Sequence, residues 1–430
     1  MDKKRIRLLV SFTLLFLGIS GPAPTSGATK KFELVAKQQD LVIGEGVVFK
    51  AMTFNGTLPG PMLVVDEGDT VEITVRNEDT VTHGLSVHAA NAQTSLVVGN
   101  LAAGQSKTLT FQADFPGVFM YHCAPGGHGI MTHTMGGMFG MIVVEPKQKY
   151  KLEEQLGKKP DLKVYVAQHE IYANGRDFFD GKPLYVMFNG YNFRYVKEPI
   201  PVRPGDYVRF YYLNVGPNLT STFHAVGGVW EYIYYGGNPN NVMAGTQSVL
   251  SGPTDSWVVD WRVPAEGPFT LVSHAFGTQA IKGAIGVLNS SKGAPRVAEV
   301  RSEGPDLKAP EKPKRIVAPF EVGSSDLDRP VRFQRGDRVL IQMVGNSFWP
   351  KVAEIPLGTE VTWVNEEVFD LLDGERTGQH NAVVIKGPGA FATPMLAHAD
   401  KFTLKLTKPG EYEYFCTVHP YMKGRIRVYK

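Results

Sequence analysis

The chain is poor in cysteine. Its 430 residues include only two, Cys123 and Cys416, and each stands close to histidines and methionines. Two cysteines this far apart could form one disulfide or could serve as two separate metal ligands. Their histidine-containing surroundings favour metal binding.

Several signatures of common enzyme classes are also missing. We find no glycine-rich phosphate loop, no GxSxG elbow and no paired-carboxylate signature, which excludes phosphoryl transfer and serine hydrolysis. The first apolar run, residues 8–20, is short for a membrane span, and no later run is long enough either. We therefore expect no membrane span in the mature chain.

The formal net charge of +3 comes from the N-terminal segment. A basic start, an apolar run and small residues near position 28 predict a secretory signal over residues 1–28, and hence a periplasmic protein. Without that segment the chain is close to neutral, so nothing in its charge favours nucleic-acid or membrane binding. The charges removed are Lys3, Lys4, Arg5 and Arg7, against Asp2.

What the chain does contain is a loose internal repeat in three copies. Residues 53–77 (TFNGTLPGPMLVVDEGDTVEITVRN) are echoed by residues 187–214 and more faintly by residues 344–365. Each copy has a turn, an alternating strand and a closing asparagine, and then runs to a histidine-bearing strand and an aromatic strand. Period-two alternation with frequent turns predicts an all-β protein of three Greek-key β-sandwiches.

The repeat predicts the domain boundaries. We expect a signal peptide over 1–28 and sandwiches over 29–150, 151–290 and 335–430. Residues 291–334 are charged, contain proline and have few large apolar side chains. This composition predicts an extended linker.

The C-terminal phrase YFCTVHPYMKGRIRV predicts a metal site. A soft thiolate, two imidazoles and a weak axial thioether make the blue-copper, or type 1, site. Cys416, His419 and Met422 would supply three ligands from one loop, and His380 of GQHNAVV the fourth. This spacing resembles that of amicyanin, a small plastocyanin-like cupredoxin.

The phrase YHCAPGGHGIMTHTMGGMFG, residues 121–140, is richer. Adjacent residues of a strand point to opposite sides, so His122 and Cys123 could ligate two different metals joined by a short covalent path. His83 and His88 of THGLSVH could likewise point toward different metals. A type 1 site would be completed by His83, Cys123, His133 and Met138, with His128 and Met131 as alternatives to His133 and Met138.

These motifs, together with STFHAVGG and TLVSHAF further on, resemble the copper-containing nitrite reductases over the first two sandwiches. The resemblance implies cupredoxin sandwiches and a homotrimer. It places a type 2 copper on His88, His122 and His274, the last from a neighbouring subunit, and it makes His224 the catalytic histidine. With the C-terminal site, we expect two type 1 coppers and one type 2 copper per chain.

The histidines do not suit a laccase-like multicopper oxidase. A trinuclear copper cluster needs eight histidines, usually in His-x-His pairs, and this chain has eleven histidines and no such pair. With four histidines assigned to type 1 sites, a full trinuclear centre is not expected.

One position departs from the family pattern. In HGLSVH, Ser86 stands where the family has a catalytic aspartate that binds nitrite and relays protons. A serine hydroxyl donates a hydrogen bond but has no accessible pKa for holding a proton.

The resemblance therefore predicts one-electron reduction of nitrite to nitric oxide, with the C-terminal cupredoxin as a tethered electron-transfer domain. An external donor such as a cytochrome c or a cupredoxin would supply the electrons. Two alternatives stay open: reduction of another small substrate, such as dioxygen or hydroxylamine, and pure electron transfer.

Overall fold

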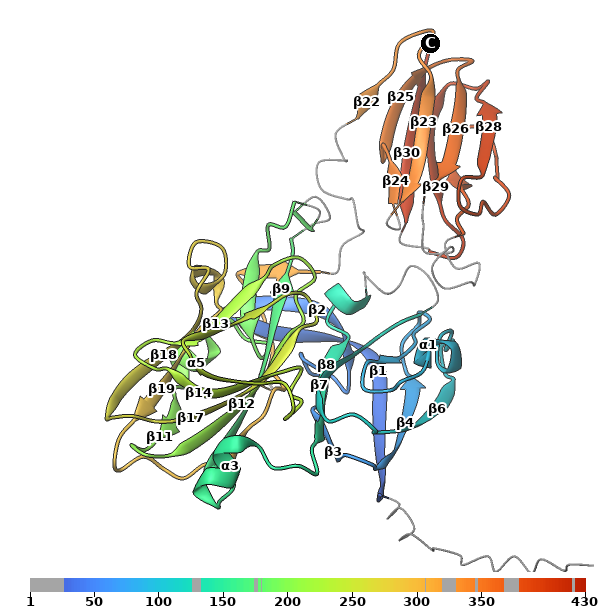
Figure 1. Cartoon of the computed structure of the whole chain (residues 1–430). Helices are drawn as coiled ribbons and strands as arrows, with labels where there is room; N and C mark the ends of the chain where they lie inside the picture. The colour runs from blue at the N-terminus through green and yellow to red at the C-terminus, as the bar shows by residue number, and fades with distance from the viewer. Residues whose placement is uncertain are drawn as a thin grey trace, which may run out of the picture.

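The structure, a computed structural model, describes residues 27–125, 133–173, 177–178, 180–305, 307–318, 330–344, 347–366, 379–419 and 422–430. The described chain is built of β-strands with a few short helices, which confirms the predicted all-β class. Its sheets pair into three sandwiches, and the C-terminal one stands apart from the other two (Figure 1). Within these ranges no helix has the length and apolarity needed to cross a membrane.

The first sandwich carries one long sheet and one short sheet. Strand β4 alternates buried and half-buried side chains along its length, because one face covers the core and the other meets solvent. The long sheet has the order β21-β2-β1-β4-β6 and the short sheet β3-β8-β7-β5. Their bounds are β1 Thr29–Gly44, β2 Val47–Phe54, β3 Leu63–Asp66, β4 Thr70–Asn77, β5 Ser86–Val87, β6 Ser106–Gln112, β7 Gly117–His122, β8 Phe139–Glu145 and β21 Arg315–Val317, with helix α1 at Thr94–Val97.

The second sandwich repeats this plan with more strands. One sheet runs β10-β9-β12-β17-β14-β15, with β20 also paired to β9, and the other runs β11-β19-β18-β13-β16. The strands are β9 Leu162–Ile171, β10 Tyr185–Phe188, β11 Ile200–Val202, β12 Tyr207–Asn214, β13 Ser221–Ala225, β14 Trp230–Tyr235, β15 Val242–Thr246, β16 Ser248–Ser251, β17 Ser256–Arg262, β18 Gly267–Ser273, β19 Ile285–Ser290 and β20 Glu299–Val300. The helices are α3 Lys151–Leu156, α5 Arg194–Lys197 and the 3₁₀ turn η1 Ala280–Lys282.

The third sandwich has its own apolar core, separate from those of the other two. Its sheets run β22-β25-β30-β29-β27 and β24-β23-β26-β28. The strands are β22 Val331–Arg332, β23 Val339–Val344, β24 Ser347–Trp349, β25 Val352–Pro356, β26 Glu360–Asn365, β27 Val383–Lys386, β28 Lys401–Lys405, β29 Gly410–Phe415 and β30 Lys423–Tyr429.

The first two sandwiches share a buried apolar interface. Val118 and Met141 of the first sandwich lie in one cluster with Tyr211 and Val258 of the second. Ser256 also donates a hydrogen bond to the carbonyl of Val118 at 2.6 Å. Because a large apolar interface disfavours relative motion of the parts that share it, these two sandwiches form one body.

The segment predicted as a linker, residues 291–334, is partly docked on this body. Strand β20 pairs with β9 of the second sandwich, and β21 pairs with β2 of the first. Glu303 accepts a hydrogen bond from the backbone N–H of Met62 at 2.9 Å. These strand partners hold the described part of the segment against the two sandwiches.

Candidate metal centres

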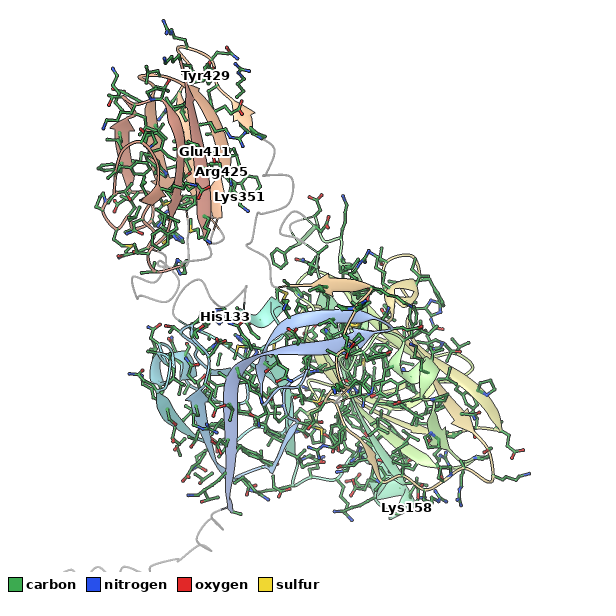
Figure 2. All side chains as sticks on the ribbon, turned by 180° about the vertical axis from the view of Figure 1, so that it is seen from behind. His133, Lys158, Lys351, Glu411, Arg425 and Tyr429 are labelled. Atoms are coloured by element: carbon green, nitrogen blue, oxygen red, sulfur yellow. The ribbon has the colours of Figure 1, made fainter. Side chains whose placement is uncertain are left out.

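The first cluster gathers three of the predicted ligands at the edge of the first sandwich that faces the third (Figure 2). Cys123 directly follows β7, and its Sγ lies 3.5 Å from the Nδ1 atoms of both His83 and His133. The two Nδ1 atoms are 3.1 Å apart. All three side chains are buried, so the donor atoms form a small triangle shielded from solvent.

Met138 is tied to this cluster through the backbone. Its N–H donates to the carbonyl of His133 at 3.0 Å, and its carbonyl accepts from the N–H of Cys123 at 2.9 Å. The side chain is fully buried in the same apolar cluster as Cys123. The alternatives His128 and Met131 fall in residues 126–132, outside the described residues.

The chemistry of this donor set fits a copper ion. Burial raises the pKa of the Cys123 thiol well above its usual range. Burial, reinforced by His83, lowers the pKa of His133 to about 3. The site thus disfavours a thiolate without a cation and keeps the His133 imidazole neutral, which is the form that binds metal. Both cysteines are free, so the disulfide alternative is wrong.

A residue that the sequence reasoning missed completes this site. The carboxylate of Asp79 lies 3.0 Å from Nε2 of His83, on the far side of the ring from Cys123. Burial alone raises the pKa of Asp79, but hydrogen bonds from His83, Thr80 and Gln38 outweigh it and lower the pKa below its ordinary value. In the sequence, Asp79 is an acid four residues before a candidate ligand, and nothing local distinguishes it from a solvated acid.

The third sandwich carries a second cluster of the same kind. Sγ of Cys416 lies 3.5 Å from Nδ1 of His419 and 3.7 Å from Nδ1 of His380. Met422 is fully buried, and its carbonyl accepts from the N–H of Cys416 at 3.0 Å. Burial raises the pKa of the Cys416 thiol.

The closing asparagine of the repeat supports both clusters in the same way. Asn77 donates its amide to the carbonyl of Leu101, which pairs with His83, and Asn365 donates to Leu396, which pairs with His380. Both hydrogen bonds measure 2.8 Å.

A histidine pair lies on the other face of β7. Nε2 of His88 is 3.2 Å from Nε2 of His122, whose Nδ1 faces the backbone carbonyl of Cys123 at 3.0 Å. Burial lowers the pKa of His122 to about 4, so its imidazole is neutral near pH 7. Ser86 pairs directly with His122 across the sheet, and the two-residue period places Ser86 on the same face as His88.

The remaining two predicted residues form a pair of their own in the second sandwich. The ring centroids of His224, on β13, and His274, just after β18, are 5.5 Å apart. His274 is exposed. In the described part of the chain only the two cysteine clusters bring three possible metal ligands together, so His274 does not join His88 and His122 within one chain.

Comparisons with known proteins show which family the chain belongs to. A family model described as multicopper oxidase matches residues 36–149, and one described as copper binding proteins, plastocyanin/azurin family, matches residues 341–429. The copper-containing nitrite reductase of Neisseria meningitidis serogroup B is 33% identical over 274 residues, which are 60% of this chain and 67% of that protein. The chain belongs to the copper-containing nitrite reductases.

Solved structures of such reductases show how far the similarity extends. The Cu-containing nitrite reductase of Thermus scotoductus SA-01 is 58% identical, with a TM-score of 0.79, and covers 94% of this chain and 99% of its own. The copper nitrite reductase of Nitrosomonas europaea is 34% identical, with a TM-score of 0.59. The alignment covers 64% of this chain and 98% of that protein. The resemblance and the cupredoxin fold predicted from the sequence are therefore confirmed, including a copper-binding C-terminal domain.

Proposed function

We propose that this enzyme reduces nitrite to nitric oxide at a type 2 copper held by His88, His122 and His274 of the partner subunit. A type 1 copper on His83, Cys123, His133 and Met138 would feed it with electrons. The names of the similar reductases support nitrite over dioxygen or hydroxylamine.

The observation that carries this proposal is the divergence of two neighbouring side chains. Cys123 faces a buried thiol–imidazole cluster, while His122 faces a second histidine on the opposite side of the strand. One peptide unit thus connects the two sites, a short covalent path for an electron. Bound copper would change oxidation state at both sites and would act as a Lewis acid toward nitrite at the second.

Reduction of one nitrite consumes one electron and two protons and releases nitric oxide and water. Ser86 can donate a hydrogen bond to a substrate oxygen from the face that carries His88 and His122. Nδ1 of His224 donates to the backbone carbonyl of Gln247, which leaves Nε2 to hold and release a proton. His224 of the partner subunit, which lies beside the partner's His274, would therefore take the proton-handling role that Ser86 cannot fill.

A homotrimer would complete the type 2 site. The surface around His224 and His274 is apolar and exposed in the single chain: Leu250 is 63% exposed, Phe276 46% and Ile281 66%. Phe276 packs on the ring of His274, with centroids 4.9 Å apart. Such a patch beside an incomplete ligand set is what a subunit interface would cover.

The third sandwich would act as a tethered electron donor, with its copper on His380, Cys416, His419 and Met422. Half-buried His419 lies beside exposed Val418, an apolar approach typical of a contact surface. The chain would then hold two type 1 coppers and one type 2 copper, would be exported to the periplasm, and would accept electrons from a cytochrome c or a cupredoxin.

The test uses the full-length, copper-loaded protein with nitrite and a small artificial reductant. Nitric oxide should form, and Cys123→Ser should abolish it together with one visible absorption component. Cys416→Ser is the matched control: it should remove the other component and leave nitric oxide formation with the artificial reductant intact. If Cys123→Ser left the spectrum and the rate unchanged, the assignment would be wrong.

A further inference from the structure

The imidazole of His83 is held from both sides. Its Nδ1 faces Sγ of Cys123 at 3.5 Å, and its Nε2 faces the carboxylate of Asp79 at 3.0 Å. Both side chains are buried, with His83 0% and Asp79 8% exposed. A metal on Nδ1 leaves the ring proton on Nε2, so His83 donates a hydrogen bond to a negatively charged group away from solvent.

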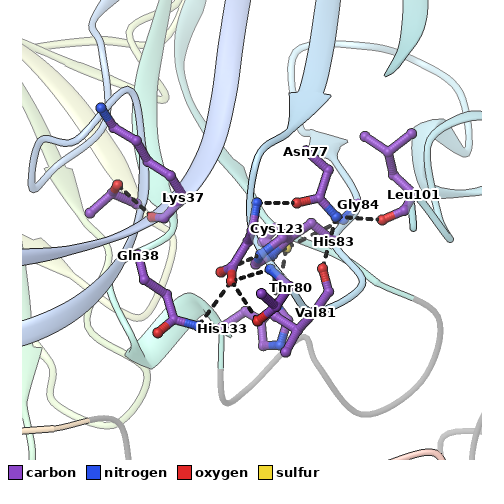
Figure 3. Close-up of polar contacts among 12 residues, drawn as sticks. Lys37, Gln38, Asn77, Thr80, Val81, His83, Gly84, Leu101, Cys123 and His133 are labelled. Carbon is purple, nitrogen blue, oxygen red and sulfur yellow. Dashed lines mark hydrogen bonds and ion pairs between the residues drawn. The ribbon is translucent and has the colours of Figure 1, made fainter. Parts of the chain in front are cut away.

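Asp79 is itself held in place by a closed set of hydrogen bonds (Figure 3). One carboxylate oxygen, Oδ1, accepts from Nε2 of Gln38 at 2.9 Å and from the N–H of Thr80 at 2.6 Å, while Oδ2 accepts from His83. The N–H of Asp79 donates to Oδ1 of Asn77 at 2.8 Å. Figure 3 draws Gln38, Thr80 and Asn77 around His83 and Cys123, with the hydrogen bonds among the drawn residues as dashed lines.

This loop is also tied to the segment that carries His83. Asn77 donates to the carbonyls of Val81 and Leu101, each at 2.8 Å. Leu101 in turn exchanges two backbone hydrogen bonds with His83, of 3.0 and 2.8 Å. The carboxylate cannot swing away from the ring without breaking a buried hydrogen bond from His83 and partly buried ones from Thr80 and Gln38, which is costly.

We propose that Asp79 is a positioning residue that lowers the reduction potential of the copper bound at His83, Cys123, His133 and Met138. A fixed negative charge across the imidazole stabilises the oxidised, more positive ion more than the reduced one. It also makes the ring a stronger donor. A lower potential drives the electron onward to the His88–His122 site. The inference rests on the proposed function in that copper occupies this cluster.

The test measures the potential directly. In a full-length Cys416→Ser background, the type 1 absorption reports only the first copper, and its potential follows from a redox titration of that band. Asp79→Asn removes the charge and offers an amide that cannot accept from both His83 and Thr80. We expect the equilibrium constant for reduction of this copper to rise about tenfold. For one electron this corresponds to a reduction potential higher by about 59 mV.

Glu78→Gln is the matched control. It removes the same formal charge one residue away, from an exposed side chain paired with Arg76, and should leave the potential unchanged. The proposal would be overturned if Asp79→Asn kept its type 1 absorption and its reduction potential shifted no more than that of Glu78→Gln.

If Asp79→Asn loses the copper, its potential cannot be measured. A second variant, Gln38→Leu, then tests the proposal. It keeps the Asp79 carboxylate but deletes a hydrogen-bond donor to it, which leaves more negative charge facing His83, so the potential should fall below that of the parent protein. An unchanged or raised potential in Gln38→Leu contradicts the proposal. Failure of the proposed function itself looks different, because the Cys416→Ser parent would then show no type 1 band or form no nitric oxide.

Discussion

Ser86 lies directly opposite His122 in the antiparallel pairing of β5 with β7. Residues in such a pair project to the same side of the sheet, so the serine hydroxyl and the imidazole share one face. Both side chains are half-buried. The hydroxyl therefore stands where a substrate bound beside His122 can accept a hydrogen bond from it.

We expect Ser86→Ala to lower kcat/KM for nitrite about fivefold, because one hydrogen bond to substrate contributes about 1 kcal/mol. Ser86→Thr keeps the hydroxyl and should stay close to the wild-type value. Steady-state nitrite reduction with an artificial reductant measures both. Equal rates for Ser86→Ala and wild type would remove Ser86 from the substrate site.

The separation of His274 from His88 and His122 within one chain predicts complementation between subunits. His274→Ala alone and His88→Ala alone should each lose the type 2 EPR signal and keep both type 1 signals. Co-expressing the two variants should restore part of the type 2 signal and of the activity, because a mixed trimer contains interfaces with all three histidines intact. A copper-loaded, active monomer in analytical ultracentrifugation would contradict a shared site.

The tethered-donor role predicts a difference between two reductants. Truncation before Arg332 and, separately, Cys416→Ser should reduce the rate with the natural donor and spare it with a small artificial reductant. The physical reason is that a covalent tether holds the donor near its acceptor, at a local concentration on the order of millimolar. Full rates with the natural donor in both variants would show that the third sandwich carries no electrons.

His169 predicts part of the pH dependence of stability. It is buried on β9, where Nε2 accepts from the N–H of Gly190 at 3.0 Å, and burial lowers its pKa to about 3. In the unfolded chain this imidazole takes up a proton below about pH 6.5, whereas in the folded chain it does not. The free energy of unfolding therefore falls by about 1.4 kcal/mol per pH unit as the pH drops from 6.5 toward 3.

His169→Gln keeps an acceptor for Gly190 but does not titrate. Between pH 7 and pH 5, the free energy of unfolding should therefore fall less in this variant than in the wild type, as followed by urea unfolding at equal copper loading. The opposite ordering, or identical losses, would mean that His169 is protonated in the folded enzyme.

Short-range features of the metal sites could be predicted from the sequence. Cys416, His419 and Met422 lie on one loop, so chain length alone keeps them close. His122 and Cys123 diverge because a strand alternates sides. The all-β class also followed from local alternation, which depends only on each segment meeting a core on one face.

Features that depend on distant segments could not be predicted in this way. Asp79 sits in a polar turn, and nothing local distinguishes it from a solvated acid. It is buried because Gln38 of β1 and the cluster around His83 close over it. The pairing of β20 with β9 and of β21 with β2 likewise depends on backbone groups that distant strands offer, which the composition of the linker segment does not reveal.

The sequence by itself therefore determined the fold class, the repeat and the candidate ligands that lie close together along the chain, because backbone geometry and loop length act locally. Tertiary structure decided that His83 and His133 meet at Cys123, that Asp79 faces His83, and that His274 stays apart from His88 and His122. Each of these depends on how the sheets pack, and sheet packing minimises the exposed apolar surface of the whole chain at once.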